Sequence, residues 1–126
     1  MFERLSNFSP PRIVHFGIGG YGSYYWEAYK KYRCEGSADL AAIIDPIAKN
    51  SPRWPEIKES GTPVFHNFEE FLEASDPVDL AVIVSPIMFH AEHACAALDA
   101  GINVLCEKPI APSVEEARRM IDSRNS

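Results

Sequence analysis

The chain has 126 residues, of which 46% are hydrophobic and 24% are charged, a composition typical of one globular domain with a buried core. Its net charge of −6 argues against nucleic-acid and anionic-membrane surfaces, because both need clustered basic side chains. Three cysteines without a C-x-x-C motif predict neither a disulfide framework nor a metal site, and no apolar run is long enough to span a membrane. We therefore expect a cytoplasmic protein with no nucleic-acid or membrane partner.

The predicted elements start after a short N-terminal leader. Residues 1–11 end in a Pro-Pro pair, and we expect one domain over residues 12–126. The β-rich run Arg12–Phe16 predicts a strand. A helix is predicted from Gly22 to a C-terminus near Gly36, because tyrosines recur there at helical spacing: Tyr25, Tyr29 and Tyr32.

The middle of the chain predicts two more strands and a helix. Asp39–Asp45 is an apolar run bounded by acids, which suits a buried parallel strand. Pro46–Thr62 is rich in proline and predicts a loop with at most a short helix. Pro63–Phe65 predicts a brief strand, and Asn67 is a candidate N-cap for the acidic helical segment Phe68–Ala74.

The last part of the chain again predicts strands that alternate with helices. Residues 79–85 form the clearest predicted strand, which Pro86 ends. The Ala-rich segment 88–100 predicts a helix closed by Gly101, and Asn103–Cys106 predicts another strand.

A capping box at Ser113 and Glu116 opens a final helix that we expect to reach about Ser123. Strands that alternate with helices indicate an α/β domain with a doubly wound parallel sheet, the Rossmann fold.

The first strand leads into the motif G-I-G-G-Y-G, in which Gly17, Gly19 and Gly22 have G-x-G-x-x-G spacing. A strand before the motif and a helix after it are the context in which this pattern binds a dinucleotide. Gly17 permits the tight turn, Gly19 leaves room for a pyrophosphate, and Gly22 lets helix and strand pack closely. The helix N-terminus then offers amide N–H groups to the phosphates.

Asp45 lies 23 residues beyond Gly22, at the end of the second predicted strand. The ends of these two strands are neighbours in a right-handed βαβ unit, so the Asp45 carboxylate can accept hydrogen bonds from the adenosine ribose. A carboxylate there disfavours a 2′-phosphate, and we expect NAD rather than NADP. Two alternatives stay open at this point, a glycine-rich turn without a ligand and a methyltransferase that binds S-adenosylmethionine.

Two further stretches follow predicted strands, S-P-I-M-F-H at Ser85–His90 and C-E-K-P at Cys106–Pro109. Open α/β sheets bind their ligands at these carboxyl ends of strands. Together with the glycine motif and Asp45, the two stretches resemble the Gfo/Idh/MocA oxidoreductases over about residues 12–120. The resemblance implies an N-terminal Rossmann domain that binds NAD or NADP. It also implies a C-terminal α/β domain that binds a sugar, polyol or related substrate.

The resemblance implies that Lys108 lies near the nicotinamide and the substrate and assists proton transfer at the hydroxyl being oxidised. An ammonium group can stabilise negative charge that develops on this oxygen, and a partly desolvated lysine can relay the proton. Glu107 is expected to orient Lys108 or to contact the nicotinamide ribose. His90 is either a structural residue or a residue at the nicotinamide end.

Ser85 and Pro86 are expected to pass under the central part of the cofactor, and Tyr21 to cover the pyrophosphate or ribose. In full, the expected cofactor-binding residues are Gly17, Ile18, Gly19, Gly20, Tyr21, Gly22, Asp45, Ser85, Pro86, His90, Glu107 and Lys108. The remaining aromatic residues of the first helix are interpreted as helix packing: Tyr24, Tyr25, Trp26, Tyr29 and Tyr32. His93 and Cys95 lack the converging ligands of a metal site.

These features predict the NAD(P)-binding domain of an oxidoreductase that transfers a hydride between the cofactor and a sugar- or polyol-like alcohol. The alternative is a non-catalytic dinucleotide-binding or redox-sensing module, and turnover by a form that includes a second domain would distinguish the two. The sequence is too short to hold the substrate domain of the family, so we expect this chain alone to be catalytically incomplete. We also expect an exposed apolar face that favours self-association.

Overall fold

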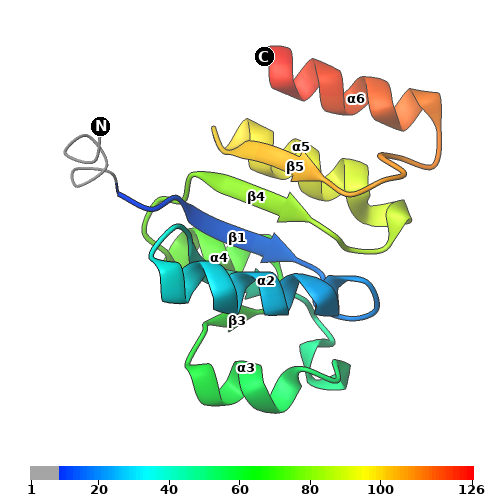
Figure 1. Ribbon diagram of the computed structural model, residues 1–126. Helices are drawn as coiled ribbons and strands as arrows, with labels where there is room; N and C mark the ends of the chain where they lie inside the picture. The colour runs from blue at the N-terminus through cyan, green and yellow to red at the C-terminus, as the bar shows by residue number, and fades with distance from the viewer. Residues whose placement is uncertain (1–8) are drawn as a thin grey trace.

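The computed structural model describes residues 9–126 and contains one parallel sheet of five strands. Most of the expected leader, residues 1–11, lies outside the described residues. The strands are β1 (Arg12–Phe16), β2 (Asp39–Ile44), β3 (Val64–Phe65), β4 (Leu80–Ile83) and β5 (Asn103–Cys106). Their order across the sheet is β3-β2-β1-β4-β5, so the winding reverses between β1 and β4 (Figure 1). This is the doubly wound order of the predicted Rossmann fold.

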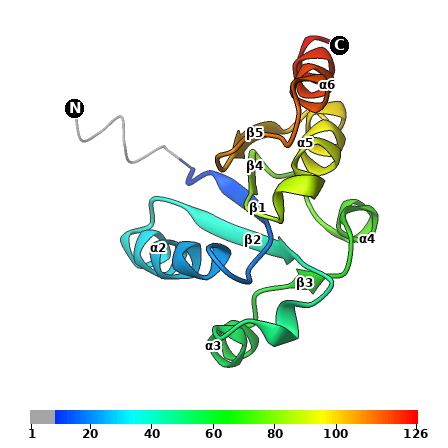
Figure 2. The same ribbon diagram turned by 90° about the vertical axis from the view of Figure 1, so that its right-hand side faces the viewer.

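Helices cover both faces of the sheet (Figure 2). One face is covered by α2 (Gly22–Glu35) and α3 (Trp54–Ser60). The other face is covered by α4 (Phe68–Ala74), α5 (His90–Asp99) and α6 (Val114–Asn125). Two 3₁₀ turns complete the elements, η1 (Ala48–Asn50) and η2 (Ile87–Phe89).

The core explains why the strands are apolar on both faces. Val14 and Phe16 of β1 pack under α4 and α5, whereas Ile13 packs with Tyr29 of α2 on the opposite face. His15 also points to the α2 side and is 0% exposed, although histidine is not a usual core residue.

Both predicted helix caps are confirmed. The Asn67 side chain accepts a hydrogen bond from the amide of Glu70 at 2.9 Å, and Ser113 accepts one from the amide of Glu116 at 3.2 Å. These are local interactions within one helical turn, which is why the sequence pattern contains them.

Several predicted element limits were wrong, most clearly those of β4 and α5. The strand expected over residues 79–85 covers only Leu80–Ile83, although the amide of Val84 still donates to the carbonyl of Phe16 at 2.8 Å. The helix expected from residue 88 begins at His90. The amide of Phe89 donates to the carbonyl of Pro86 at 2.8 Å, so η2 precedes the α-helical pattern.

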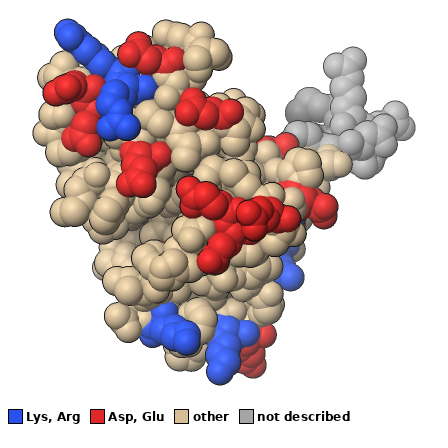
Figure 3. Space-filling model, turned by 180° about the vertical axis from the view of Figure 1, so that it is seen from behind, with Lys and Arg blue, Asp and Glu red and all other residues tan. Residues whose placement is uncertain are grey.

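Acidic side chains are spread over the face of the molecule that Figure 3 shows, in keeping with the net charge of −6. Within residues 9–126, no helix combines the length and the apolar character needed to cross a membrane. All three cysteines are free thiols.

Candidate functional site

The glycine motif forms the turn between β1 and α2, and two of its glycines are required by close packing. Gly17 has a φ of 87°, and a Cβ there would lie 2.6 Å from the backbone of Ser85. A Cβ on Gly22 would lie 2.0 Å from the carbonyl oxygen of Gly17. The structure therefore confirms the tight turn at Gly17 and the close packing of helix and strand at Gly22.

The tip of this loop faces open space. A Cβ on Gly19 would meet no atom within 4 Å. The first amides of α2 donate to loop carbonyls at 3.0 to 3.1 Å, but the amides of Gly19, Gly20 and Tyr21 find no acceptor within residues 9–126. These three amides, rather than those of the helix itself, are the donors available to an anion at this end of the sheet.

Asp45 ties the glycine loop to the end of β2. Its Oδ2 accepts a hydrogen bond from the amide of Ile18 and its Oδ1 one from the amide of Ile47, each at 2.9 Å. The side chain of Ile18 is fully buried, so that residue faces the core. Sequence reasoning missed this structural role, because the pattern shows the acid but not which amides it accepts. Each carboxylate oxygen keeps a second lone pair for a further donor.

A pocket of about 310 Å³ lies at the carboxyl ends of β4 and β5, which we call the carboxyl-edge pocket. It brings together five of the predicted site residues from three distant parts of the sequence, the glycine loop, the S-P-I-M-F-H stretch and the C-E-K-P stretch. Its lining consists of Tyr21, Val84, Ser85, Ile87, His90, Glu107, Lys108 and Pro109. The sequence indicated neither Val84 nor Ile87 as lining residues.

His90 connects the two strand-end stretches. It is 3% exposed, with Nε2 at 2.6 Å from the carbonyl oxygen of Ser85 and Nδ1 at 3.0 Å from that of Pro109. Both ring nitrogens therefore contact the protein itself, which favours the structural alternative for this residue. The Cys106 thiol lies 3.4 Å from His90 Nδ1, and burial raises the pKa of Cys106 to about 11, so the thiol stays protonated at neutral pH.

Glu107 is held on both oxygens. Oε2 accepts a hydrogen bond from the hydroxyl of Tyr25, and Oε1 accepts one from the amide of Lys108 at 3.2 Å. The hydrogen bond from Tyr25 is the largest cause that lowers the pKa of Glu107, followed by the one from Lys108. The side chain of Lys108 is exposed, so the partial desolvation expected for it is not provided by these residues.

Ser85 has a partner that the sequence did not indicate. Its Oγ lies 2.8 Å from Nδ1 of His93, and the His93 ring packs against Phe16 and Phe89 at centroid distances of 4.8 and 5.9 Å. Burial lowers the pKa of His93, so its neutral ring can accept the Ser85 hydroxyl. The spacing from residue 85 to residue 93 bridges a strand end, a 3₁₀ turn and a helix, which no single periodicity describes.

The aromatic residues of α2 fall into three groups by burial. Trp26 and Tyr29 are buried, as expected for helix packing. The packing expectation was wrong for Tyr24 and Tyr32, which are 68% and 44% exposed because they lie on the solvent side of the helix. Tyr25 is half-buried: it packs against a buried cluster of β1, β4 and α2 side chains, as expected, and it also donates to Glu107 at the edge of the site.

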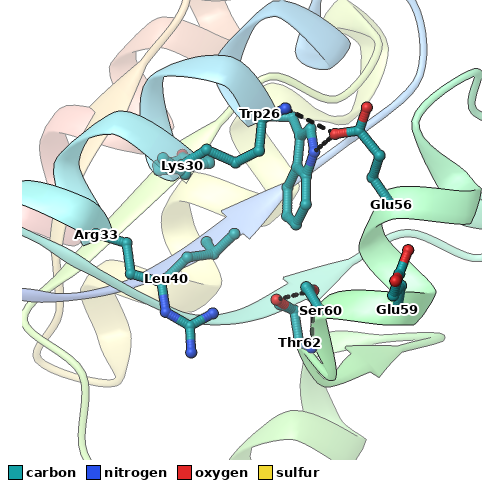
Figure 4. Close-up of a pocket in the computed structure, with 9 residues that line it drawn as sticks. Trp26, Lys30, Arg33, Leu40, Glu56, Glu59, Ser60 and Thr62 are labelled. Carbon is teal, nitrogen blue, oxygen red and sulfur yellow. Dashed lines mark hydrogen bonds and ion pairs between the residues drawn. The ribbon is translucent and has the colours of Figure 1, made fainter.

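A second cavity of about 230 Å³ lies between α2 and α3 (Figure 4). Trp26 Nε1 donates to the carboxylate of Glu56 at 2.8 Å, and Lys30 pairs with the same carboxylate at 2.7 Å. None of the predicted site residues lines this cavity, so it is separate from the carboxyl-edge pocket.

A doubly wound sheet with a glycine loop at its switch point, and with Lys108 in a pocket beside it, defines the class of dinucleotide-binding Rossmann domains. The family model of the Gfo/Idh/MocA proteins, described as an oxidoreductase family with an NAD-binding Rossmann fold, matches residues 12–126. This chain belongs to that family.

Several relatives are dehydrogenases by name. The chain is 37% identical over 112 residues to glucose-6-phosphate 3-dehydrogenase of Bacillus subtilis, covering 89% of this chain and 30% of the relative. It is 35% identical over 111 residues to inositol 2-dehydrogenase of Corynebacterium glutamicum, covering 88% and 32%. An NADP-dependent relative, D-xylose 1-dehydrogenase of Haloarcula marismortui, is 25% identical over 124 residues, covering 95% and 33%.

The fold matches the WlbA dehydrogenase of Bordetella pertussis, solved with NADH and UDP-GlcNAcA, with a TM-score of 0.78 at 22% identity. This match covers 92% of this chain and 34% of that protein. The chain therefore spans about a third of the length of the proteins that it resembles.

Proposed function

We propose that this chain binds NAD along the carboxyl edge of its sheet and forms the cofactor-binding part of a cytoplasmic oxidoreductase that acts on a sugar- or polyol-like alcohol. The observation that carries the proposal is the carboxyl-edge pocket, in which Ser85, Glu107 and Lys108 lie beside the glycine loop. The names of the relatives, which include inositol 2-dehydrogenase and glucose-6-phosphate 3-dehydrogenase, support this class of substrate.

The residues at this edge fit a dinucleotide. Gly19 opens to free space, and the amides of Gly19, Gly20 and Tyr21 are available as donors to a pyrophosphate. The free lone pairs of Asp45 suit the hydroxyls of the adenosine ribose. The negative charge of Asp45 repels a 2′-phosphate, which favours NAD over NADP.

When bound, NAD supplies the hydride acceptor, and the chain supplies the groups around it. Lys108 Nζ is the donor that stabilises negative charge on the substrate oxygen and takes part in transfer of its proton. The Glu107 carboxylate accepts hydrogen bonds from the nicotinamide ribose. His90 has a different role: it holds the backbone at Ser85 and at Pro109 in place and so shapes the pocket.

A thermal-shift experiment tests the proposal, with NAD, NADP and S-adenosylmethionine added in parallel to the folded protein. A ligand at 100 times its dissociation constant stabilises the folded state by about 2.7 kcal/mol. We expect the largest increase in melting temperature with NAD.

Three outcomes count against parts of the proposal. No shift with either nicotinamide nucleotide would contradict cofactor binding. A larger shift with NADP would overturn the role given to Asp45. A shift with S-adenosylmethionine alone would favour a methyltransferase.

A further inference from the structure

We propose that Tyr25 is a positioning residue for Glu107, and that through Glu107 it sets the part of the carboxyl-edge pocket that takes the nicotinamide half of the dinucleotide. The inference rests on the proposed function and goes beyond it, because it brings in a residue of α2 that does not itself line the pocket. The contact joins residues 82 positions apart, the first helix and the end of β5.

The Tyr25 ring lies among aromatic rings of β1, the glycine loop and α2. Its ring centroid lies 5.4 Å from that of His15, 6.2 Å from that of Tyr21 and 6.3 Å from that of Tyr29. These rings restrict the side-chain torsions of Tyr25, so little conformational freedom is lost when its hydroxyl donates to Glu107.

The phenol is a hydrogen-bond donor at neutral pH. Burial first, and then the hydrogen bond with Glu107, raise the pKa of Tyr25 to about 12. A carboxylate is an acceptor only, so the Tyr25 hydroxyl must donate to it. Hydrogen bonds to an ionised partner are stronger than neutral ones, and this one favours the ionised form of Glu107.

Two consequences follow for the pocket. The Tyr25 and Lys108 amide bonds fix both oxygens of Glu107 and leave their remaining lone pairs for ligand donors such as a ribose diol. In the described part of the chain, Glu107 forms no ion pair with Lys108 Nζ, so this ammonium stays free for a substrate oxygen.

Removal of the Tyr25 hydroxyl should therefore weaken the binding of the nicotinamide half of the dinucleotide and not that of the adenosine half. In Tyr25→Phe, we expect NADH, followed by its fluorescence, to bind about fivefold more weakly, because Glu107 loses its fixed orientation. ADP, which shares only the adenosine and pyrophosphate half, should bind as it does to the wild type. Tyr24→Phe is the matched control, because its largely exposed ring lies on the same helix, and it should change neither affinity.

The pH dependence of NADH binding shows whether Tyr25 acts through Glu107. The groups that face this carboxylate are Tyr25 from α2, His90 from α5, and Cys106 and Lys108 from its own segment. Without the Tyr25 hydroxyl the pKa of Glu107 rises, so the loss of affinity at acid pH should begin at a higher pH in Tyr25→Phe than in the wild type.

A double-mutant cycle completes the experiment. Glu107→Gln should remove the part of the loss of NADH affinity at acid pH that depends on protonation of Glu107. When Tyr25→Phe is added to Glu107→Gln, NADH binding should weaken less than twofold further. An equal loss of affinity for ADP and NADH in Tyr25→Phe would overturn the inference, since it would mean a general change in the fold. Unchanged NADH binding would overturn it as well. A wild type that binds neither ligand would instead contradict the proposed function, and the inference with it.

Discussion

At the scale of single residues, His15 is the most deeply buried polar side chain of the described residues. It is fully buried in β1, with Nε2 at 2.8 Å from the carbonyl oxygen of Gly17 and Nδ1 at 2.5 Å from the hydroxyl of Tyr29. The neutral ring satisfies both contacts, because Nε2–H donates to the carbonyl and Nδ1 accepts the hydroxyl. Burial is the main cause that lowers the pKa of His15 from 6.5 to about 4, against smaller opposing effects of Gly17 and Asp45.

This burial predicts acid sensitivity. The folded state holds His15 neutral, so its contribution is fully present above pH 6.5 and is lost as the pH falls through 6.5 towards 4. Between pH 7 and pH 5, urea unfolding should show wild-type stability falling by about 2 kcal/mol more than that of His15→Gln. His66→Gln, at an exposed histidine, should keep the wild-type slope. Parallel pH curves for wild type and His15→Gln would contradict this account.

The sequence indicated Ser85, Glu107 and Lys108 as site residues because they lie at the ends of predicted strands and because their two stretches resemble those of the oxidoreductase family. The pocket brings these three residues together as expected. Tyr25 could not be found in this way, since its contact with Glu107 spans 82 positions and depends on how the fold brings α2 near the residue that follows β5. The hydrogen bonds from two backbone amides to Asp45 were missed for a related reason. Almost every residue type has a backbone amide, so the sequence does not show which amides donate to a given carboxylate.

At the scale of elements, Gly22 and Gly19 have different roles in the strand–turn–helix unit formed by β1 and α2. A Cβ at position 22 would lie 2.0 Å from a carbonyl oxygen, so the chain would have to shift, whereas a Cβ at position 19 would meet nothing. The first glycine is required by the fold. The packing of the fold leaves room for a side chain at Gly19, and the proposed function gives that space to the pyrophosphate.

Two alanine variants test this separation. Gly22→Ala should lower the free energy of unfolding by about 2 kcal/mol or more through steric overlap. Gly19→Ala should change it by less than about 0.5 kcal/mol. The affinity of Gly19→Ala for NADH should nevertheless fall by at least about tenfold, because the methyl group fills the space of the pyrophosphate. Denaturant unfolding and NADH titration measure the two effects. Wild-type NADH affinity in Gly19→Ala would place the dinucleotide elsewhere.

Element types were predictable where one local pattern decides them. Asn67 and Ser113 cap helices through bonds to an amide three residues away, and both caps were read correctly. Element ends were less predictable where tertiary pairing decides them. Residues 80–84 are apolar throughout, but the ladder of β4 stops at Ile83, where its partner β1 ends and the chain turns at Gly17.

At the scale of the whole molecule, one side of the sheet is incompletely covered. Within the described residues β5 pairs with β4 alone, so its other edge has unpaired backbone groups. Val104 and Cys106 pack towards the main core, but Leu105 points to the opposite face and is 48% exposed. Free strand edges and exposed apolar side chains both favour association between chains.

This surface predicts concentration-dependent self-association of the chain. Leu105→Lys should reduce it, because a lysine on an edge strand disfavours pairing with a second edge and removes apolar surface. Leu72→Lys is the matched control, since Leu72 is 47% exposed but lies on α4, away from the β5 edge. Sedimentation velocity over a wide range of concentration should show the wild type and Leu72→Lys shifting to larger species, while Leu105→Lys stays closer to a monomer. A wild type that sediments as a monomer at every concentration would show that this face does not associate.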